Sequence, residues 1–543
     1  MKRPLIYWIV TVLVAVAAAT AAYFIGKSSA GNVNDEFLAE LEQLRRDQSD
    51  AAVVKRVSQQ MEDIAFLQKT VSDQERDRAE QQSELALAMR DRAEQESRIA
   101  RDAESKAKAA VAEAEEQRAK ALVHQQMAEE QRDAATLAKS ISDTLNYRAI
   151  GRTLGNSAIT LYESGNTGMA AKMAYTSWYF LNTFNGNTYQ PETYNALSLC
   201  SNSQAGIQTV QGGTVRALHP LYGIGCVTVT DYGEIEIHRT SGVRRSIVLQ
   251  NNTYDFRDVW ADDNNIYALS LHGPLCQTDY SRFVREIPLP EGTYISLTNM
   301  DSERFMIAAK KHLLIMDKKS GTIITRKDLT RELTTLVRDD KGSILFFSDG
   351  SEARLADDMT LTDINLTDGR SVTAAYYDQN LCALFLGFDN GDIELFNRHG
   401  VKTAELVGHT GKITDIITAG DIMASASYDR SVLVWNLPMI KFNGSSNLAE
   451  ALDIPQSKVG NAHSAAINEW MNPVAITYQS WPLALCQFSP TEVVAGTANG
   501  EVHRFNVSTD DMASKLKNSS DVNFSDEEWE RYVGSSVPHI SFK

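Results

Sequence analysis

Glycine and proline are absent from residues 32–150, although the chain of 543 residues contains 31 glycines and 12 prolines. Because these are the residues that most often interrupt helices, nothing in this segment breaks a helix. Its first half shows the 3–4 spacing of a coiled-coil seam. The apolar seam positions are Val54, Val57, Met61, Ile64 and Val71, and Gln68 is the one polar position. A long helix with a polar surface needs a partner strand. We therefore expect a coiled-coil stalk over residues 32–146 that forms a homo-oligomer; a solvated, partly helical linker is the alternative.

Cysteine and the common catalytic motifs are also scarce. There are five cysteines and no CxxC pair, which excludes a disulfide framework, a zinc ribbon and a thioredoxin-type site. The ten histidines include no HExxH, and the chain has neither a GxSxG elbow nor a Walker A loop. We expect no cofactor, no metal site and no enzymatic activity.

Positive charge is in deficit, with 53 Lys and Arg against 70 Asp and Glu and a formal net charge of −17. Nucleic-acid binding requires a basic surface, so this balance argues against DNA or RNA as a main partner. Hydrophobic residues make up 43% of the chain, which is typical of a globular protein.

An apolar run without any charge lies at the N-terminus, over residues 5–25, shortly after Lys2 and Arg3. As a helix it would extend about 32 Å, enough to cross a bilayer. We expect a membrane anchor over residues 1–30, with a cleaved signal peptide as the alternative. The basic residues before the span place the N-terminus in the cytoplasm and the bulk of the chain on the other side of the membrane.

After Gly151 the pattern changes to shorter apolar helices. A first helix is indicated by apolar residues at helical spacing. It is followed by a turn at residues 165–168, a second apolar helix at residues 169–181 and a third helix that starts at Pro191. This arrangement resembles one tetratricopeptide-like helix pair with a cap. We expect a helical collar over residues 147–203 that docks on a neighbouring domain, because one pair cannot bury its own faces.

The segment LVGHTGKITDIITAGDIMASASYDRSVLVWNL, residues 406–437, contains three strands, a tight turn and a final Trp-Asn. Weaker copies of its turn and last strand recur along the chain, with the equivalents of Trp435 at His238, Thr278, Met316, Leu355, Phe396 and Phe505. Five of the six spacings are 38 to 41 residues, the period of a propeller blade. We expect seven blades between residues 205 and 508, with an insertion at about 440–475 as a binding loop; a disordered excursion is the alternative for the insertion.

The ring has a predicted closure. Residues 207–210, followed by Gly212, match residues 403–407, which lead into Gly408. An outer strand placed before the first blade completes the last blade and removes an exposed sheet edge.

The segment resembles a WD40 repeat, with Asn436 in place of the usual Asp. The resemblance assigns a buried hydrogen-bonded set to His409, Asp429, Trp435 and a serine, either Ser425 or Ser427, of which we choose Ser427. Their expected role is structural. A catalytic role for the same residues is disfavoured, because such sets recur in propellers that only bind.

The C-terminal residues 509–543 form a tail in which residues 525–528 are a capping box before a helix that carries Trp529. The order of anchor, stalk, collar, propeller and tail resembles the C-terminal part of bacterial multidomain WD40 proteins with NTPase or TIR domains.

The resemblance implies a multidomain protein with a single transmembrane helix, a coiled coil, a helical collar and a seven-bladed WD40-type propeller. We expect a scaffold or adaptor of the bacterial inner membrane that binds proteins in the periplasm through its propeller faces and the 440–475 loop. A ligand-sensing propeller coupled to a membrane partner and a propeller hydrolase are the alternatives.

Overall fold

The computed structural model describes residues 120–204, 206–240, 245–445, 447–455, 457 and 472–542, together with residues 89, 92 and 95. The chain divides into two compact units, Met1–Gln131 and Arg132–Lys543. The predicted membrane span at residues 5–25 and the predicted stalk up to residue 119, apart from those three positions, lie outside the described residues. Within the part that is described, no helix is long and apolar enough to cross a bilayer.

The helical part of the second unit is built from both ends of its sequence. Residues 132–163 of helix α4 (Lys120–Glu163) and helices α5 (Thr167–Thr183) and α6 (Pro191–Cys200) precede the strands, and α8 (Thr509–Ser519) and α9 (Asp526–Tyr532) follow them. The Asn166 side chain accepts from the Met169 N–H and caps α5, and Pro191 opens α6 with its fixed φ. The second and third predicted collar helices are confirmed.

The strands form seven antiparallel sheets of four strands each. Blade 1 contains β2 (Val215–Leu221), β3 (Gly225–Thr230), β4 (Glu234–Arg239) and β5 (Arg245–Gln250); blade 2 contains β6 (Phe256–Ala261), β7 (Ile266–Ser270), β8 (Leu275–Thr278) and β9 (Phe283–Ile287). Blade 3 contains β10 (Tyr294–Asn299), β11 (Arg304–Ala309), β12 (His312–Asp317) and β13 (Ile323–Asp328); blade 4 contains β14 (Leu333–Asp339), β15 (Gly342–Phe347), β16 (Glu352–Leu355) and β17 (Leu361–Ile364).

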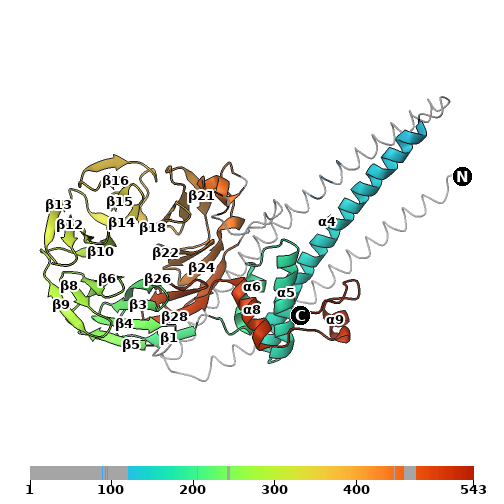
Figure 1. Ribbon diagram of the computed structural model, residues 1–543, viewed down its shortest axis with the longest axis horizontal. Helices are drawn as coiled ribbons and strands as arrows, with labels where there is room; N and C mark the ends of the chain where they lie inside the picture. Colours follow the sequence, from blue (N-terminus) through green and yellow to red (C-terminus); the bar gives the residue numbers. More distant parts are fainter. Residues whose placement is uncertain are drawn as a thin grey trace, which may run out of the picture. The chain divides into compact units, whose positions relative to one another are not determined.

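The remaining blades follow the same order. Blade 5 contains β18 (Val372–Asp378), β19 (Ala383–Phe388), β20 (Ile393–Phe396) and β21 (Lys402–Leu406); blade 6 contains β22 (Ile413–Ala419), β23 (Ile422–Ser427), β24 (Ser431–Asn436) and β25 (Val474–Thr477). Blade 7 contains β26 (Pro482–Ser489), β27 (Glu492–Thr497), β28 (Glu501–Asn506) and β1 (Gly206–Val210). The sheets are arranged around a ring, with α6 and α8 beside β24 and β28 (Figure 1).

The ring closes as predicted. Strand β1 pairs antiparallel with β28, with Val210 opposite Glu501, so the first strand of the sequence completes the last blade. The pairing joins the two ends of the propeller sequence and covers a sheet edge.

The hydrophobic core lies between the blades. Each pair of neighbouring blades shares one apolar cluster; Val227 of blade 1, for example, lies with Phe256 of blade 2. The second strands β3, β15 and β19 are buried at every position because both of their faces are packed between sheets. The cluster between blades 6 and 7 extends into the helices, where Tyr194 donates to the carbonyl of Asn506 at 2.5 Å. The helical part therefore docks on the ring, as the sequence predicted.

The insertion in blade 6 is partly packed on the ring. Helix α7 (Leu448–Leu452) is capped by Asn447, and its apolar side chains join the core between blades 5 and 6. The Asn443 N–H donates to the Thr403 carbonyl at 2.7 Å. Residues 458–471 of the insertion lie outside the described residues.

Candidate protein-interaction face

One face of the ring carries the turns between second and third strands together with the loops that lead into the inner strands. We call it the turn face. Main-chain hydrogen bonds tie turns to the neighbouring loops: the Tyr428 N–H donates to the Lys412 carbonyl at 2.9 Å, and the Ala498 N–H donates to the Trp481 carbonyl at 2.9 Å. The opposite face carries the loops between first and second strands, such as the loop with Tyr222.

The predicted buried set is present in blade 6. The Trp435 Nε1–H donates to Ser425 Oγ at 3.0 Å, and His409 Nε2 lies 2.8 Å from the same oxygen. His409 Nδ1 lies 2.8 Å from Asp429 Oδ2. Because a carboxylate can only accept, Nδ1 is the donor in this contact. The set fixes the loop before β22 against the turn before β24.

The serine of this set is Ser425, and the choice of Ser427 was wrong. Ser427 Oγ donates to the Gly411 carbonyl at 2.8 Å and accepts from the Asp429 N–H at 3.1 Å. Both serines point to the same side of β23, because strand side chains alternate with a period of two. Ser425 lies deeper in the blade, at the level of the tryptophan, whereas Ser427 is the last residue of the strand and bonds to the turn.

Asp429 is the hub of the turn. It accepts from the Thr410 N–H at 3.0 Å and from the Ser431 N–H and Oγ–H at 2.9 and 2.6 Å. Burial alone would raise the pKa of this carboxyl, but the hydrogen bonds from His409 and the other donors outweigh it and lower the pKa below its ordinary value. The carboxylate is therefore retained as a structural anion.

This set does not present a nucleophile. Ser425 is 0% exposed and His409 5%, and the serine oxygen is held between the indole and the imidazole. A substrate carbonyl therefore has no path to the hydroxyl in this arrangement, whose effect is to brace the blade.

Blade 1 contains a variant of the same arrangement, which the sequence analysis missed. Gln211 takes the place of His409 and donates to Thr228, which takes the place of Ser425; His238 Nε2 lies 3.2 Å from Thr228 Oγ1. Burial, with a smaller contribution from Arg245, lowers the pKa of His238 to about 4, so the ring is neutral at physiological pH. The alignment of His238 with Trp435 was the feature of the sequence that could have predicted this polar set.

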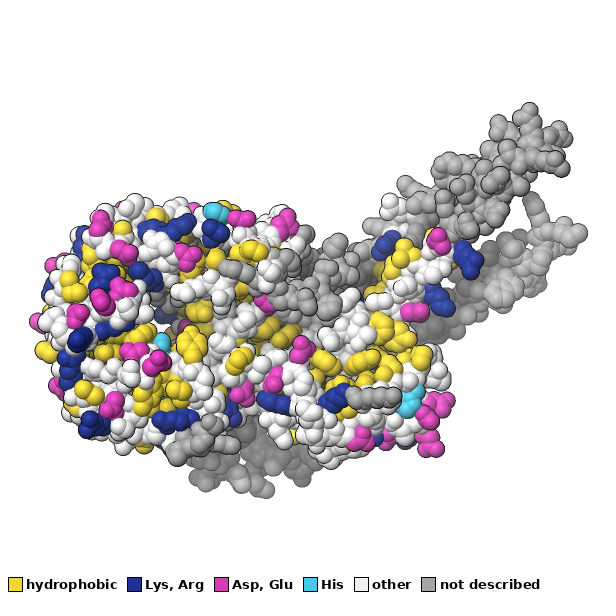
Figure 2. All heavy atoms as spheres, in the orientation of Figure 1, with side chains coloured by type: hydrophobic (Ala, Val, Ile, Leu, Met, Phe, Trp, Pro, Cys, Tyr) yellow, Lys and Arg dark blue, Asp and Glu magenta, His cyan; other side chains and the backbone are white. Residues whose placement is uncertain are grey.

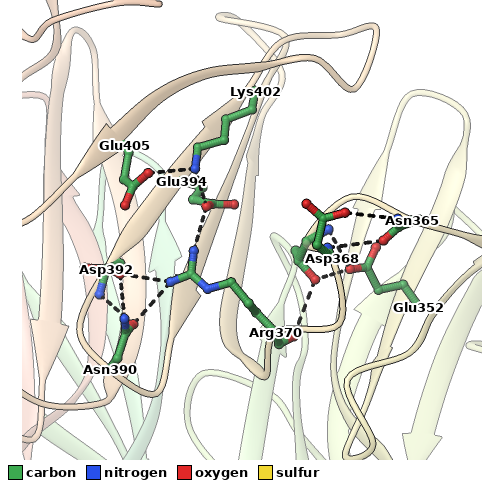
Figure 3. Close-up of polar contacts among 10 residues, drawn as sticks. Glu352, Asn365, Asp368, Arg370, Asn390, Asp392, Glu394, Lys402 and Glu405 are labelled. Carbon is green, nitrogen blue, oxygen red and sulfur yellow. Dashed lines mark hydrogen bonds and ion pairs between the residues drawn. The ribbon is translucent and has the colours of Figure 1, made fainter.

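The outer part of the turn face at blades 4 and 5 is a network of neutralised charges. In Figure 3, Arg370 lies between Asp392 and Glu394, with contacts of 2.9 and 2.6 Å, and Lys402 contacts Glu394 and Glu405. A depression of about 380 Å³ lies beside this network. It is lined by Arg331, Asp349, Gly350, Ser351, Glu352, Asp363, Ile364, Asn365 and Gly369.

Cations in this region of the turn face are already paired. Arg331 donates to Asp363 at 2.6 Å, and its guanidinium stacks on Phe347 at 4.2 Å. Glu352 accepts from the main-chain N–H groups of Leu366 and Thr367. Figure 2 likewise shows positive and negative side chains interspersed over the visible face of the ring.

The turn face differs between blades 6 and 7. Tyr428 and Trp481 are 45% and 48% exposed, and their ring centroids lie 5.5 Å apart at 54°. Lys412 Nζ lies 5.8 Å from the Tyr428 ring, and Arg430 is exposed on the same turn. We call these four residues the blade 6–7 patch. The sequence analysis predicted only a tight turn at Tyr428 and Arg430, within residues 406–437, and no binding role for them.

Two carboxylates connect inner strands near the centre of the ring. Asp415 accepts from the Leu485 N–H of blade 7 at 2.7 Å, and Asp258 accepts from the Leu297 N–H of blade 3 at 2.7 Å. Loss of contact with water raises the pKa of Asp415 to about 7 and that of Asp258 to about 6, against the opposing effect of these N–H donors. Each carboxyl braces two neighbouring blades.

No protein-family model and no curated protein sequence matches this chain. Solved structures do match. The WD40 β-propeller domain of Doa1 has a TM-score of 0.45 and 11% identity over 56% of this chain and 98% of that one. The computationally designed Ika8 protein has a TM-score of 0.39 and 15% identity over 55% and 98%. YCF48, in a structure bound to D1 peptide, has a TM-score of 0.42 and 13% identity over 56% and 97%.

The strand pairing itself defines the class: the second unit contains a seven-bladed β-propeller, and the structures that match it include a WD40 propeller. Blade 6 carries the hydrogen-bonded set that the WD40 resemblance led us to expect, with Ser425 in place of Ser427.

Proposed function

We propose that this protein is a non-enzymatic, membrane-anchored scaffold that holds a partner protein on the turn face of its propeller. The observation that carries the proposal is the blade 6–7 patch, where two large aromatic side chains are exposed side by side on a rigid ring. Exposed aromatic residues are enriched at protein interfaces because they bury much area at a low entropic cost.

The rigidity of the ring supports this role. The loop before β22 and the turn before β24 are fixed by the buried set of His409, Ser425, Asp429 and Trp435. A partner that docks on pre-formed loops loses less conformational entropy than one that must order them. The same set supports a binding function over a hydrolytic one, since its serine is fully buried.

The anchor and the oligomer belong to the proposal as well. The uncharged run at residues 5–25 and the preceding Lys2 and Arg3 support a single-pass protein of the bacterial inner membrane with its propeller in the periplasm. Helix α4 presents Leu137, Ile141 and Leu145, which are 63%, 48% and 47% exposed and recur every four residues. An apolar stripe of this kind is suited to pack against the same helix of a second copy.

The location is tested by protease protection. Intact vesicles with the cytoplasmic side outward should protect the propeller, and detergent should expose it. Digestion of the propeller in sealed vesicles would reverse the topology, and recovery of the chain in the soluble fraction would remove the anchor from the proposal.

The interaction is tested by site-specific photocrosslinking in cells. A photoreactive phenylalanine analogue is introduced at Tyr428 and, as the matched control, at Tyr222, which is 86% exposed on the opposite face. We expect one discrete protein adduct from position 428. If the chain is recovered without adduct from position 428 at native expression level, the turn face is not the interaction surface.

A further inference from the structure

The blade 6–7 patch contains the one group of cations on the described turn face for which the structure shows no acidic partner. Elsewhere on this face five cations contact a carboxylate within 3 Å, in the pairs Arg216–Asp231, Arg257–Asp255, Lys310–Glu332, Arg331–Asp363 and Arg370–Asp392. Lys311, on the turn of blade 3, is a single exposed lysine without such a contact among the described residues and has no exposed aromatic pair beside it. Lys412 and Arg430 have no such contact among the described residues. The nearest carboxylate in sequence, Asp429, is occupied, since one oxygen binds His409 and Thr410 and the other binds Ser431.

Arg430 is also held in a backbone conformation that disfavours it. In five of the other blades the same turn position is glycine with positive φ, and its N–H donates to the last residue of the second strand, at Gly233, Gly273, Gly350, Gly391 and Gly500. Arg430 makes the equivalent bond to the Ser427 carbonyl at 3.2 Å and has a φ of 67°. A side chain at such a φ is strained, whereas glycine is not. A long cation at a position suited to glycine indicates a role for the guanidinium itself.

The patch is pre-formed. The Tyr478 N–H donates to the Arg430 carbonyl at 2.8 Å, and the Tyr428 N–H donates to the Lys412 carbonyl. These bonds tie the turn of blade 6 to the segments that carry Lys412 and Trp481. The two cations and the two rings are therefore held together before any partner arrives.

We infer that the blade 6–7 patch binds an extended acidic segment of a partner protein, whose carboxylates contact Lys412 and Arg430 and whose apolar side chain packs on Tyr428 and Trp481. Charge complementarity selects this occupant: two cations without acidic partners are combined with exposed aromatic surface, in a chain whose net charge is −17. The inference rests on the proposed function and specifies the chemistry of its partner.

The test is selection of a displayed random-peptide library on the full-length protein. We expect the enriched peptides to carry a net negative charge and at least one large apolar residue. Their affinity should fall by about tenfold or more in Lys412→Glu and Trp481→Ala, because an attractive charge contact becomes repulsive or the apolar contact is lost. The controls Lys319→Glu and Tyr222→Ala, on exposed loops of the opposite face, should leave the affinity unchanged.

Arg430→Gly separates binding from folding. This variant removes the guanidinium and relieves the strained φ, so its thermal midpoint should exceed that of the wild type while peptide affinity falls. A loss of affinity in this variant cannot be assigned to misfolding.

Three results of the peptide selection would overturn the inference: enriched peptides that are neutral or basic, acidic peptides whose affinity is unchanged by all patch substitutions, or no enriched peptide at all. A short oligothymidine that competes more strongly than the peptides would also overturn it, because the site would then bind polyanions in general. A partner crosslinked at Tyr428 together with neutral or basic peptides would leave the proposed function in place, whereas absence of any crosslinked partner would remove the proposed function itself.

Discussion

The indole N–H of Trp435 donates to the hydroxyl oxygen of Ser425 at 3.0 Å, inside a blade where the serine has no exposed surface. The imidazole of His409 contacts the same oxygen and carries the connection to Asp429 on the turn. A single hydroxyl therefore links the third strand of blade 6 to the loop and turn that form the turn face.

Ser425→Ala is expected to destabilise the protein by about 1–3 kcal/mol, because it leaves the buried indole N–H without an acceptor. Urea unfolding measures the loss. Ser281→Ala, on an exposed turn, should stay within about 0.5 kcal/mol of the wild type. The indole N–H resonance of Trp435 should shift in Ser425→Ala and remain in place in Ser427→Ala; the reverse pattern would falsify the assignment of Ser425 to the set.

Arg430→Gly is expected to stabilise the protein by about 1 kcal/mol, because glycine adopts the φ of 67° without the penalty that a side chain incurs there. Arg430→Ala keeps that penalty and removes the same charge, so it is the matched control. Thermal and urea unfolding of the three proteins should rank Arg430→Gly above the other two. An unchanged or lowered stability in Arg430→Gly would show that the guanidinium itself stabilises the fold.

Asp415 is expected to make stability pH-dependent. Its pKa is raised to about 7 in the folded chain from an ordinary value of 3.8, so the folded state binds its proton more tightly than the unfolded state does. Its contribution is therefore fully present below about pH 4 and is lost as the pH rises through about 7.

The destabilisation caused by Asp415→Ala should consequently be larger at about pH 5 than at about pH 8. Urea unfolding at the two pH values measures the difference. Thr335→Ala is the control, since Thr335 follows the corresponding register shift in the inner strand of blade 4 and does not ionise in this range. An equal loss at both pH values would place the pKa of Asp415 near its ordinary value.

Trp529→Ala is expected to cost about 3–5 kcal/mol, the range for removal of a buried tryptophan. Trp529 is 3% exposed, contacts the rings of Phe180 and Phe524, and donates to the Val537 carbonyl at 2.9 Å. Its loss should also detach the tail, with faster cleavage of residues after 520 in limited proteolysis. Tyr532→Ala, on the same helix and 36% exposed, should change stability by about 0.5 kcal/mol or less. Equal effects of the two substitutions would argue against packing of the tail on α5.

The ring and its closure could be predicted from patterns along the chain alone. Each turn needs residues that reverse the chain, and each third strand needs side chains that can be buried. Similar residue types therefore recur every 38 to 41 residues, which is the length of one blade. The match between residues 207–210 and residues 403–407 was sufficient to predict that β1 completes blade 7. The capping box at Ser525 was equally local and is confirmed.

The contacts between polar and charged groups could not be predicted in this way and became visible only in the folded protein. Ser425 and Ser427 lie on the same side of β23, and the depth of the indole in the blade selects between them. Lys412 and Trp481 are distant in sequence, and the sharing of Asp429 among His409, Thr410 and Ser431 leaves that carboxylate occupied beside the two cations. The physical reason is the distance along the chain over which each feature is determined. Periodicity is determined by neighbouring residues, whereas the partners of a side chain depend on where separate strands and loops place their atoms in space.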